Sequence, residues 1–473
     1  MKTQIKLSAA AIALVGAFGG MPSAFAAGEA TNVIFFLGDG MGPTTVTASR
    51  IYKYGEAGQL TMETLKRTAR IRTYSNDAQT TDSAPSMAAY MTGVKMNNEV
   101  LSMSADTKAY NGSTPYVTSA GDSTCPASGN GTAATTLLEL SKAAGKSVGA
   151  VTTTRVTHAT PAATYAHICH RDGENDIAAQ VVPGSSKYNA ALGSGVDVLL
   201  GGGSKFFLPT AAGGKRTDGV DLTALLQTAG YTYVNTGTAF KALNPATTTK
   251  LVGLFNKDHL NYELDRAKTA NKIDEPSLAD MTETAIKILQ KNGKGYFLMV
   301  EGGRIDHALH GTNAKRALED TVAFDNAIKR ALGLVDLKNT LVVVTADHDH
   351  TMTFNGYSHK GNNILGKVSD IKPTTVQGKT VLAKAGDGLP YTALVFGNGA
   401  VRKPVRDDLT SVDTAADDYY QEVGVKLGTA GNYPETHGGG DVMLFSSGAG
   451  NAGFKGTLDN TKVFGLVKSA MGL

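Results

Sequence analysis

Short runs of β-branched and other apolar residues constrain the fold of this chain more than any other feature. They occupy residues 33–37, 148–153, 196–200, 296–300, 341–345 and 442–445. Continuous apolar runs of this length are typical of strands that are buried on both faces of a sheet. Helical patterns lie between them, at residues 133–144, 280–291 and 313–332. Strands that alternate with helices predict an α/β fold, a three-layer α/β/α sandwich around a central, mostly parallel β-sheet.

Chemically active side chains directly follow several of these runs. Asp39 comes just after the first run, Glu301 follows the fourth, and Asp347 and His348 follow the fifth. In open α/β sheets, ligands bind beyond the carboxyl ends of the strands. We therefore expect these side chains to meet at one edge of the sheet, although they lie far apart in the sequence.

Side chains that can bind metals are also concentrated around Asp306 and His310. Four residues apart on a helical turn, a carboxylate and an imidazole can hold one metal ion. Taken alone, this spacing also fits a solvated surface pair, and residues 347–350 also fit a polar loop. The mixture of oxygen and nitrogen donors suits zinc, and His437, which lies among glycines, could supply a further ligand.

Ser83, in the segment DSAPS, is the candidate nucleophile. The segment is not a G-x-S-x-G elbow, which argues against acyl transfer by a Ser-His-Asp triad. The glycine-rich segment GDGMG at residues 38–42 lacks the spacing of a nucleotide phosphate loop. With no basic partner near it in sequence, Ser83 would need another activator, and a metal ion can serve. Taken alone, however, Ser83 reads as the N-cap of a helix.

Together these segments resemble the alkaline phosphatase family over nearly the whole chain after residue 26. The matching segments follow the family order: FFLGDGMG, TDSAPSMAAYMTGVK, THATPAATYAHICHR, VEGGRIDHALH, TADHDH and ETHGGGDVMLF. The forms VEGGRIDHALH and DHDHTMTFNGY are more similar to the animal-type branch than to the best-known enteric bacterial one. The resemblance therefore predicts a secreted bacterial member with animal-type features.

The resemblance implies a role for each matching residue. Ser83 would be the nucleophile that becomes phosphoserine, and the planar fork of Arg171 would hold the phosphate oxygens of the substrate. The implied metal ligands are Asp39, Asp347 and His348 for one Zn²⁺, Asp306, His310 and His437 for a second Zn²⁺, and Asp39, Thr160 and Glu301 for one Mg²⁺. Oxygen donors around the third ion agree with the preference of magnesium.

Two histidines depart from the enteric bacterial pattern. His158 stands where that branch has an aspartate near magnesium, and His307 stands where it has a lysine near the phosphate. Animal-type members carry histidine at both positions. We expect His158 to touch metal-bound water rather than the ion, although a histidine there could also recruit a third zinc. A solvated or core histidine is the alternative for each.

The implied activity is hydrolysis of phosphate monoesters to an alcohol and inorganic phosphate through a phosphoserine, with an alkaline optimum and a broad substrate range. Phosphodiesterases, sulfatases and phosphomutases with a similar metal core are the alternatives. Sulfatases need an arginine four residues after the nucleophile, where this chain has Met87. Diesterases commonly use threonine as nucleophile and lack the arginine clamp. A non-catalytic metal- or phosphate-binding protein would have lost site residues, and here every expected position is filled.

Residues 1–26 predict a secretory signal peptide. Lys2 and Lys6 precede an apolar stretch, and Ala24-Phe25-Ala26 matches an A-x-A cleavage site. A membrane anchor is the alternative, but the stretch is short for a spanning helix, which needs about 20 residues. We therefore expect a secreted or periplasmic protein without a membrane anchor.

Residues 27–473 are predicted to form a single domain, in which residues 355–433 resemble the crown-like insertion of animal-type members. Because members of the family are usually homodimers, the resemblance also implies a homodimer. With 45 basic and 42 acidic residues, the chain offers no electrostatic case for a nucleic acid partner, and small phosphomonoesters are the expected substrates. Cys125 and Cys169 could form a disulfide in an oxidising compartment or remain free and buried.

Overall fold

The computed structural model describes residues 29–371, 380–400, 402–427 and 434–473, so the predicted signal peptide lies outside the described residues. A sheet of 10 strands forms the centre, in the order β19-β2-β18-β10-β1-β9-β5-β6-β8-β7. These strands are β1 (Asn32–Gly38), β2 (Arg67–Arg72), β5 (Ser147–Arg155), β6 (Val198–Gly202), β7 (Thr232–Val234), β8 (Leu251–Leu254), β9 (Tyr296–Gly302), β10 (Thr340–Ala346), β18 (Val442–Gly448) and β19 (Gly456–Asp459). Neighbours in the sheet run parallel except where β18 pairs with β10 and β2. The predicted α/β class is confirmed.

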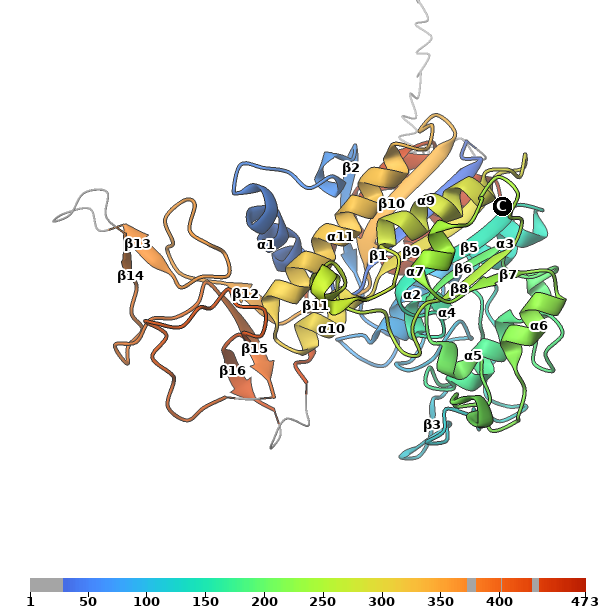
Figure 1. The fold of residues 1–473 in the computed structure, drawn as a ribbon, viewed down its shortest axis with the longest axis horizontal. Coiled ribbons are helices and arrows are strands. Elements are labelled where there is room, and N and C mark those ends of the chain that lie inside the picture. The colour runs from blue at the N-terminus through green and yellow to red at the C-terminus, as the bar shows by residue number, and fades with distance from the viewer. Residues whose placement is uncertain (1–28, 372–379, 401, 428–433) are drawn as a thin grey trace, which may run out of the picture.

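Helices cover both faces of this sheet, as Figure 1 shows for the near face. On one face, α1 (Pro43–Tyr54) and α9 (Leu278–Leu289) pack against the long helix α11 (Ala314–Leu332). On the other, α2 (Ser83–Thr92) packs against α3 (Leu137–Ala143) and α12 (Asn460–Met471). The predicted apolar face of α11 forms because Leu318, Val322 and Ile328 recur at helical spacing and are buried.

The carboxyl ends of three central strands meet at one edge. Leu37 on β1 lies opposite Glu301 on β9, and Gly38 lies opposite Ala346 on β10. The parallel register therefore delivers Asp39, Glu301 and Asp347 to the same place, in agreement with the expectation for this edge. Gly40 allows the chain to turn there, because it has φ +65 and a Cβ atom would lie 2.4 Å from the His350 ring.

A small sheet is built by the part of the chain that follows β10. Its strands are β12 (Met352–Phe354), β15 (Leu394–Gly399) and β16 (Val423–Lys426), and a hairpin of β13 (Ser369–Ile371) and β14 (Thr380–Leu382) lies beyond it. Figure 1 shows these strands to one side of the main sandwich, past α10 (Arg304–His310). The segment is thus a separate elaboration beside the edge where the carboxylates meet.

Two observations bear on the environment of the protein. Cys125 and Cys169 are joined in a disulfide, which decides between the two alternatives that the sequence left open. Within the described ranges, none of the helices combines the length and the hydropathy that crossing a membrane requires.

Candidate active site

Ser83 is the first residue of α2 and lies at the centre of the site. Its side chain is buried, and its Oγ lies 3.2 Å from His348 Nε2 and 3.4 Å from Asp39 Oδ1. The reading of Ser83 as an N-cap is wrong, since Asp82 occupies that position and accepts a hydrogen bond from Ala84 N at 2.7 Å. Ser83 therefore points toward the metal-type ligands, at the positive end of the helix dipole.

Asp347 and His348 follow β10 and face Ser83. Asp347 Oδ1 accepts hydrogen bonds from the backbone N–H groups of Gly40 and His348, each at 3.0 Å. The other oxygen, Oδ2, is buried without a hydrogen-bond partner in the described part of the chain and lies 3.6 Å from His348 Nε2. His348 Nδ1 donates to Asp349 O at 3.2 Å. The other ring nitrogen, Nε2, therefore carries a lone pair, which is directed at Ser83 and Asp39.

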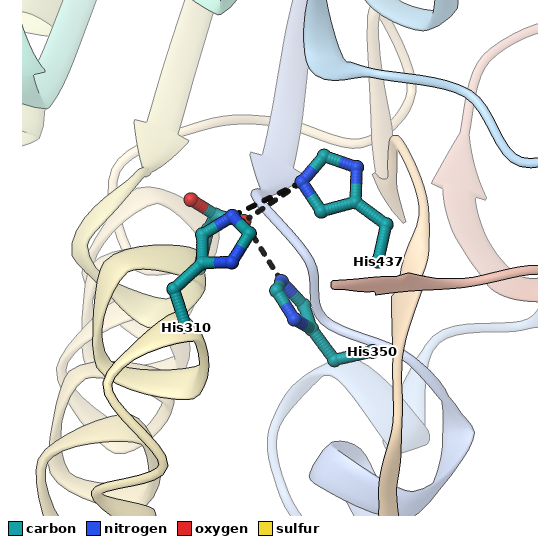
Figure 2. A group of neighbouring side chains, drawn as sticks. His310, His350 and His437 are labelled. Atoms are coloured by element: carbon teal, nitrogen blue, oxygen red, sulfur yellow. Dashed lines mark hydrogen bonds and ion pairs between the residues drawn. The ribbon is translucent and has the colours of Figure 1, made fainter. Parts of the chain in front are cut away.

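Asp306, His310 and His437 meet beside this pair. Figure 2 shows three imidazoles, those of His310, His350 and His437, converging on one point. The Nδ1 atoms of His310 and His437 donate to the backbone oxygens of Glu435 and Thr81, respectively. The Nε2 atom of each ring therefore carries a lone pair, yet the two Nε2 atoms lie only 3.1 Å apart. Two lone pairs at this distance repel each other unless a cation lies between them.

A third group lies on the other side of Asp39. Glu301 Oε2 accepts hydrogen bonds from Thr152 and Thr154, whereas Oε1 is buried and has no partner among the described residues. Thr160, on the short helix α4 (Ala159–Ala162), has its hydroxyl 3.5 Å from Asp39 Oδ2. Ligand atoms of Asp39, His158 and Glu301 lie within 4.8 Å of one another. His158 thus lies beside the proposed magnesium ligands, and its contact with metal-bound water stays a prediction.

Burial of the carboxylates shows that this edge needs positive charge. Asp39, Glu301 and Asp347 are completely buried, and Asp306 is nearly so. Burial and the charges of Asp347, Asp306 and Glu301 raise the pKa of Asp39 well above its usual value. Burial also raises the pKa of Glu301 to about 7. Bound cations would remove this repulsion and satisfy the unpartnered oxygens, so the residues present fit metal ions.

Arg171 holds its guanidinium next to the nucleophile. Its Nη1 donates to Asp82 Oδ1 at 3.0 Å, and its Nη2 lies 3.0 Å from His158 Nε2. Its backbone N–H donates to Glu99 O at 2.7 Å. Because Asp82 immediately precedes Ser83, this salt bridge directs the planar fork of Arg171 to the side of the site where Ser83 lies.

His350 and Glu435 are the most important site residues that sequence reasoning missed. His350 Nε2 lies 2.7 Å from Asp306 Oδ1, and Nδ1 lies 2.6 Å from Glu435 Oε2. Burial opposes the charged ring, but these two carboxylates raise the pKa of His350 to about 10. The ring therefore orients Asp306. The signal was present, since His350 is the last residue of TADHDH and Glu435 is the first of ETHGGG.

Two other residues near the site, His259 and Glu99, belong to none of the sequence motifs. The His259 ring lies 4.2 Å from that of His307 and 5.3 Å from that of His158, measured between centroids. His259 lies between β8 and α9, in a part of the chain where no motif was recognised in the sequence. Only the prediction of β8 would have shown that His259 follows a strand ending at the same edge. Glu99, with φ +72, lies beside Arg171, and burial together with Asp82 raises its pKa to about 7.

Comparison with known proteins agrees with this geometry. The family model described as alkaline phosphatase matches residues 30–473. The chain belongs to the alkaline phosphatase family. The tissue-nonspecific alkaline phosphatase of Mus musculus is 39% identical to it over 450 residues, which cover 89% of this phosphatase and 79% of the mouse protein. The alkaline phosphatase of Gadus morhua is 38% identical over 451 residues, covering 89% and 87%.

Solved structures of the family share its fold. The alkaline phosphatase of Thermus thermophilus superposes with a TM-score of 0.68 at 27% identity, covering 96% of this phosphatase and 95% of that chain. The enzyme from the Antarctic bacterium TAB5 gives a TM-score of 0.63 at 22% identity, covering 93% and 98%. The phosphatase is accordingly a hydrolase, and metal-dependent hydrolysis of phosphate monoesters is the activity of its family. The predicted membership of the alkaline phosphatase family is confirmed, and vertebrate members are among the relatives that the chain resembles.

Proposed function

We propose that this alkaline phosphatase hydrolyses monoesters in two steps, with Ser83 as the group that first accepts the phosphate. The proposal rests on the environment of the Ser83 Oγ atom. It lies within 3.4 Å of both Asp39 and His348, and Arg171 is bound to Asp82, the residue before Ser83. A bound cation would stabilise the alkoxide of a serine in this position, so that the hydroxyl proton passes to solvent and no basic side chain is needed.

The donor sets support two zinc ions and one magnesium ion. Asp39, Asp347 and His348 would hold one zinc, Asp306, His310 and His437 the second, and Asp39, Thr160 and Glu301 magnesium. When bound, these ions would favour the Ser83 alkoxide, the departing alcohol oxygen and a hydroxide from water. A mutant of the TAB5 enzyme is described with Mg bound in its M3 site, which agrees with a magnesium site in this fold.

The protein residues then account for the chemistry at phosphorus. Ser83 Oγ forms a bond to phosphorus, the bond to the alcohol oxygen breaks, and the alcohol leaves with a proton from solvent. Hydroxide next attacks the phosphoserine and releases Ser83 Oγ and inorganic phosphate. Throughout, the Arg171 fork binds two phosphate oxygens, and Asp82 and His158 hold its Nη1 and Nη2. Because hydroxide is the second attacking group, activity should rise toward alkaline pH.

A kinetic comparison of variants tests this proposal. Hydrolysis of an aryl phosphate monoester is measured for the wild type with and without chelator, for Ser83→Ala, and for the control Ser141→Ala. Ser141 is a buried serine on α3 whose hydroxyl donates to Leu137 O instead of facing metal-type ligands. We expect chelation and Ser83→Ala each to lower kcat at least about a thousandfold, whereas Ser141→Ala keeps wild-type rates. Faster hydrolysis of a diester than of the monoester would contradict the assignment.

Export and dimerisation complete the proposal. The signal-like residues 1–26 and the Cys125–Cys169 disulfide support a secreted or periplasmic protein. In the small sheet and its neighbouring loops, several large apolar side chains are exposed: Phe354, Tyr357, Val405, Tyr420 and Val425. Exposed apolar groups on one elaboration support a homodimer contact through residues 355–433. Sedimentation of the wild type and of Tyr357→Ser would test this part, since a monomeric wild type contradicts it.

A further inference from the structure

A cleft of about 1130 Å³ opens between the end of α10 and the small sheet. At its inner end lie His307 and His310, on the last turns of α10. Most of the remaining wall surface is apolar and comes from Tyr391, Val395, Phe396, Tyr419, Tyr420 and Val423. Charged side chains also line the cleft, namely Arg402, Lys403, Arg406, Asp407 and Glu422. The cleft is therefore continuous with the site described above and carries a different, mostly hydrophobic surface.

The orientation of the site decides what enters this cleft. Ser83 lies beside His348 and Asp39, whereas His310 lies beyond them, against Asp306 and His437. In an in-line displacement, the attacking and departing oxygens lie on opposite sides of phosphorus. If Ser83 attacks from the His348 side, the alcohol departs on the His310 side. The cleft begins at His310, so the alcohol part of a bound substrate extends into it.

The far wall of the cleft is held in place by several contacts with the sandwich. Gln421 N donates to Thr312 O at 2.9 Å, and Asn313 Nδ2 donates to Asp417 O at 2.9 Å. Lys315 Nζ lies 2.6 Å from Asp417 Oδ1. Thr312, directly after α10, adopts φ +54, a conformation that a threonine keeps only where its surroundings impose it. The cleft is thus preformed rather than created by a ligand.

We propose that this cleft binds the alcohol part of the substrate and gives the enzyme a preference for phosphate monoesters of aromatic or other bulky apolar alcohols. The inference rests on the proposed function, and it concerns the group that leaves rather than the phosphate. Flat rings gain most from such walls, because they bury a large apolar area while losing little conformational freedom. Small alkyl phosphates would leave the walls of the cleft uncovered.

The test compares two esters whose alcohols are both primary alkyl alcohols, naphthylmethyl phosphate and ethyl phosphate. The ratio of their kcat/KM values is measured for the wild type, Tyr420→Ala, Val395→Trp and the control Tyr54→Ala. Val395 lies opposite Thr353 in the small sheet, and both line the cleft. The larger side chain of Val395→Trp therefore occupies the part of the cleft next to Thr353. Tyr54, on α1, is an exposed tyrosine that does not line it.

We expect the wild type to prefer the naphthylmethyl ester by about tenfold, the effect of burying roughly 60 Å² more apolar surface. Tyr420→Ala should reduce the preference about threefold, and Val395→Trp should abolish it, since burial is lost in both. Ethyl phosphate turnover and inhibition by inorganic phosphate should stay unchanged in both variants, which shows that they fold. Tyr54→Ala should behave as the wild type does.

Binding without turnover separates this inference from the proposed function. Calorimetry measures the affinity of Ser83→Ala for naphthylmethylphosphonate and ethylphosphonate, alone and combined with Val395→Trp. Tighter binding of the naphthylmethyl compound that Val395→Trp removes supports the cleft even if hydrolysis fails. Equal affinities, or a kcat/KM ratio that neither cleft variant changes, would overturn the inference. A changed oligomeric state of Val395→Trp together with an unchanged kcat/KM ratio would also overturn it, because the cleft would then bind a second copy.

Discussion

At the scale of single residues, backbone contacts prepare the imidazoles for cations. His310, His348 and His437 each use Nδ1 to donate to a backbone oxygen, so each presents Nε2 as a lone pair. Burial, followed by the effect of His348, holds the pKa of His437 well below its ordinary value, so this ring stays neutral near pH 7. The chain thus fixes the tautomers that metal binding requires before any ion binds.

Glu99 provides a pH-dependent prediction at this scale. Burial and Asp82 raise its pKa from 4.5 to about 7, although Arg171 opposes the shift. A carboxyl with a raised folded pKa stabilises the fold fully below its unfolded pKa, and this stability is lost as pH rises through the folded value. Between pH 4.5 and pH 7, the wild type should therefore lose roughly 3 kcal/mol of unfolding free energy relative to Glu99→Gln.

Denaturant unfolding of the wild type and Glu99→Gln at pH 5 and pH 8 measures this difference. The two proteins should be similar at the lower pH, and the variant should be the more stable at the higher pH. A difference in stability that does not change with pH would show that Glu99 is not the group that titrates.

At the scale of elements, the sequence predicted the strands that are apolar on both faces and missed those that are not. The runs at 33–37, 296–300 and 341–345 lie within β1, β9 and β10. Strands β7 and β8 at the sheet edge are short, and no apolar run marked them, so His259 stayed unnoticed. The metal-type residues were predictable because each follows a buried strand or a helical turn. Contacts such as Arg171 with Asp82 depend on loop packing, which no local pattern encodes.

The Cys125–Cys169 disulfide should affect both the stability of the fold and the position of Arg171. Cys169 lies two residues before Arg171, and the bridge spans a sequence separation of 44. Closing a loop of this length removes chain entropy worth about 4 kcal/mol from the unfolded state. Cys125→Ser combined with Cys169→Ser should lower the unfolding free energy by about that amount and weaken inhibition by inorganic phosphate, because Arg171 loses its anchor.

Wild type treated with reductant under native conditions serves as the matched control and should reproduce both changes. If the denaturation midpoint and the inhibition constant for phosphate both stay at wild-type values, the bridge neither stabilises the fold nor positions Arg171.

At the scale of the whole molecule, stability should depend on the metal ions that bind at the carboxyl edge of the sheet. Without ions, burial raises the pKa values of Asp39 and Glu301, the latter to about 7. The metal-free protein therefore loses stability as pH rises through these values, since the buried carboxyls must then ionise. Ions at a thousand times their Kd would restore about 4 kcal/mol.

Scanning calorimetry with chelator, and then with added Zn²⁺ and Mg²⁺, checks this dependence. We expect the increase in Tm on adding the ions to be larger at pH 8.5 than at pH 6. An equal increase at both pH values would mean that the buried carboxylates are not the groups that the ions stabilise.

The central claim is that Ser83 carries the phosphate between the two steps, and direct detection of the phosphoenzyme tests it. The metal-loaded wild type is incubated with a phosphate monoester at mildly acidic pH, where hydroxide attack is slow, quenched with acid, digested and analysed by mass spectrometry. Phosphate should be found on Ser83, and it should be absent after chelation and in Ser83→Ala. Turnover without phosphate on Ser83, or a Ser83→Ala variant that still forms a phosphoenzyme, would contradict the account.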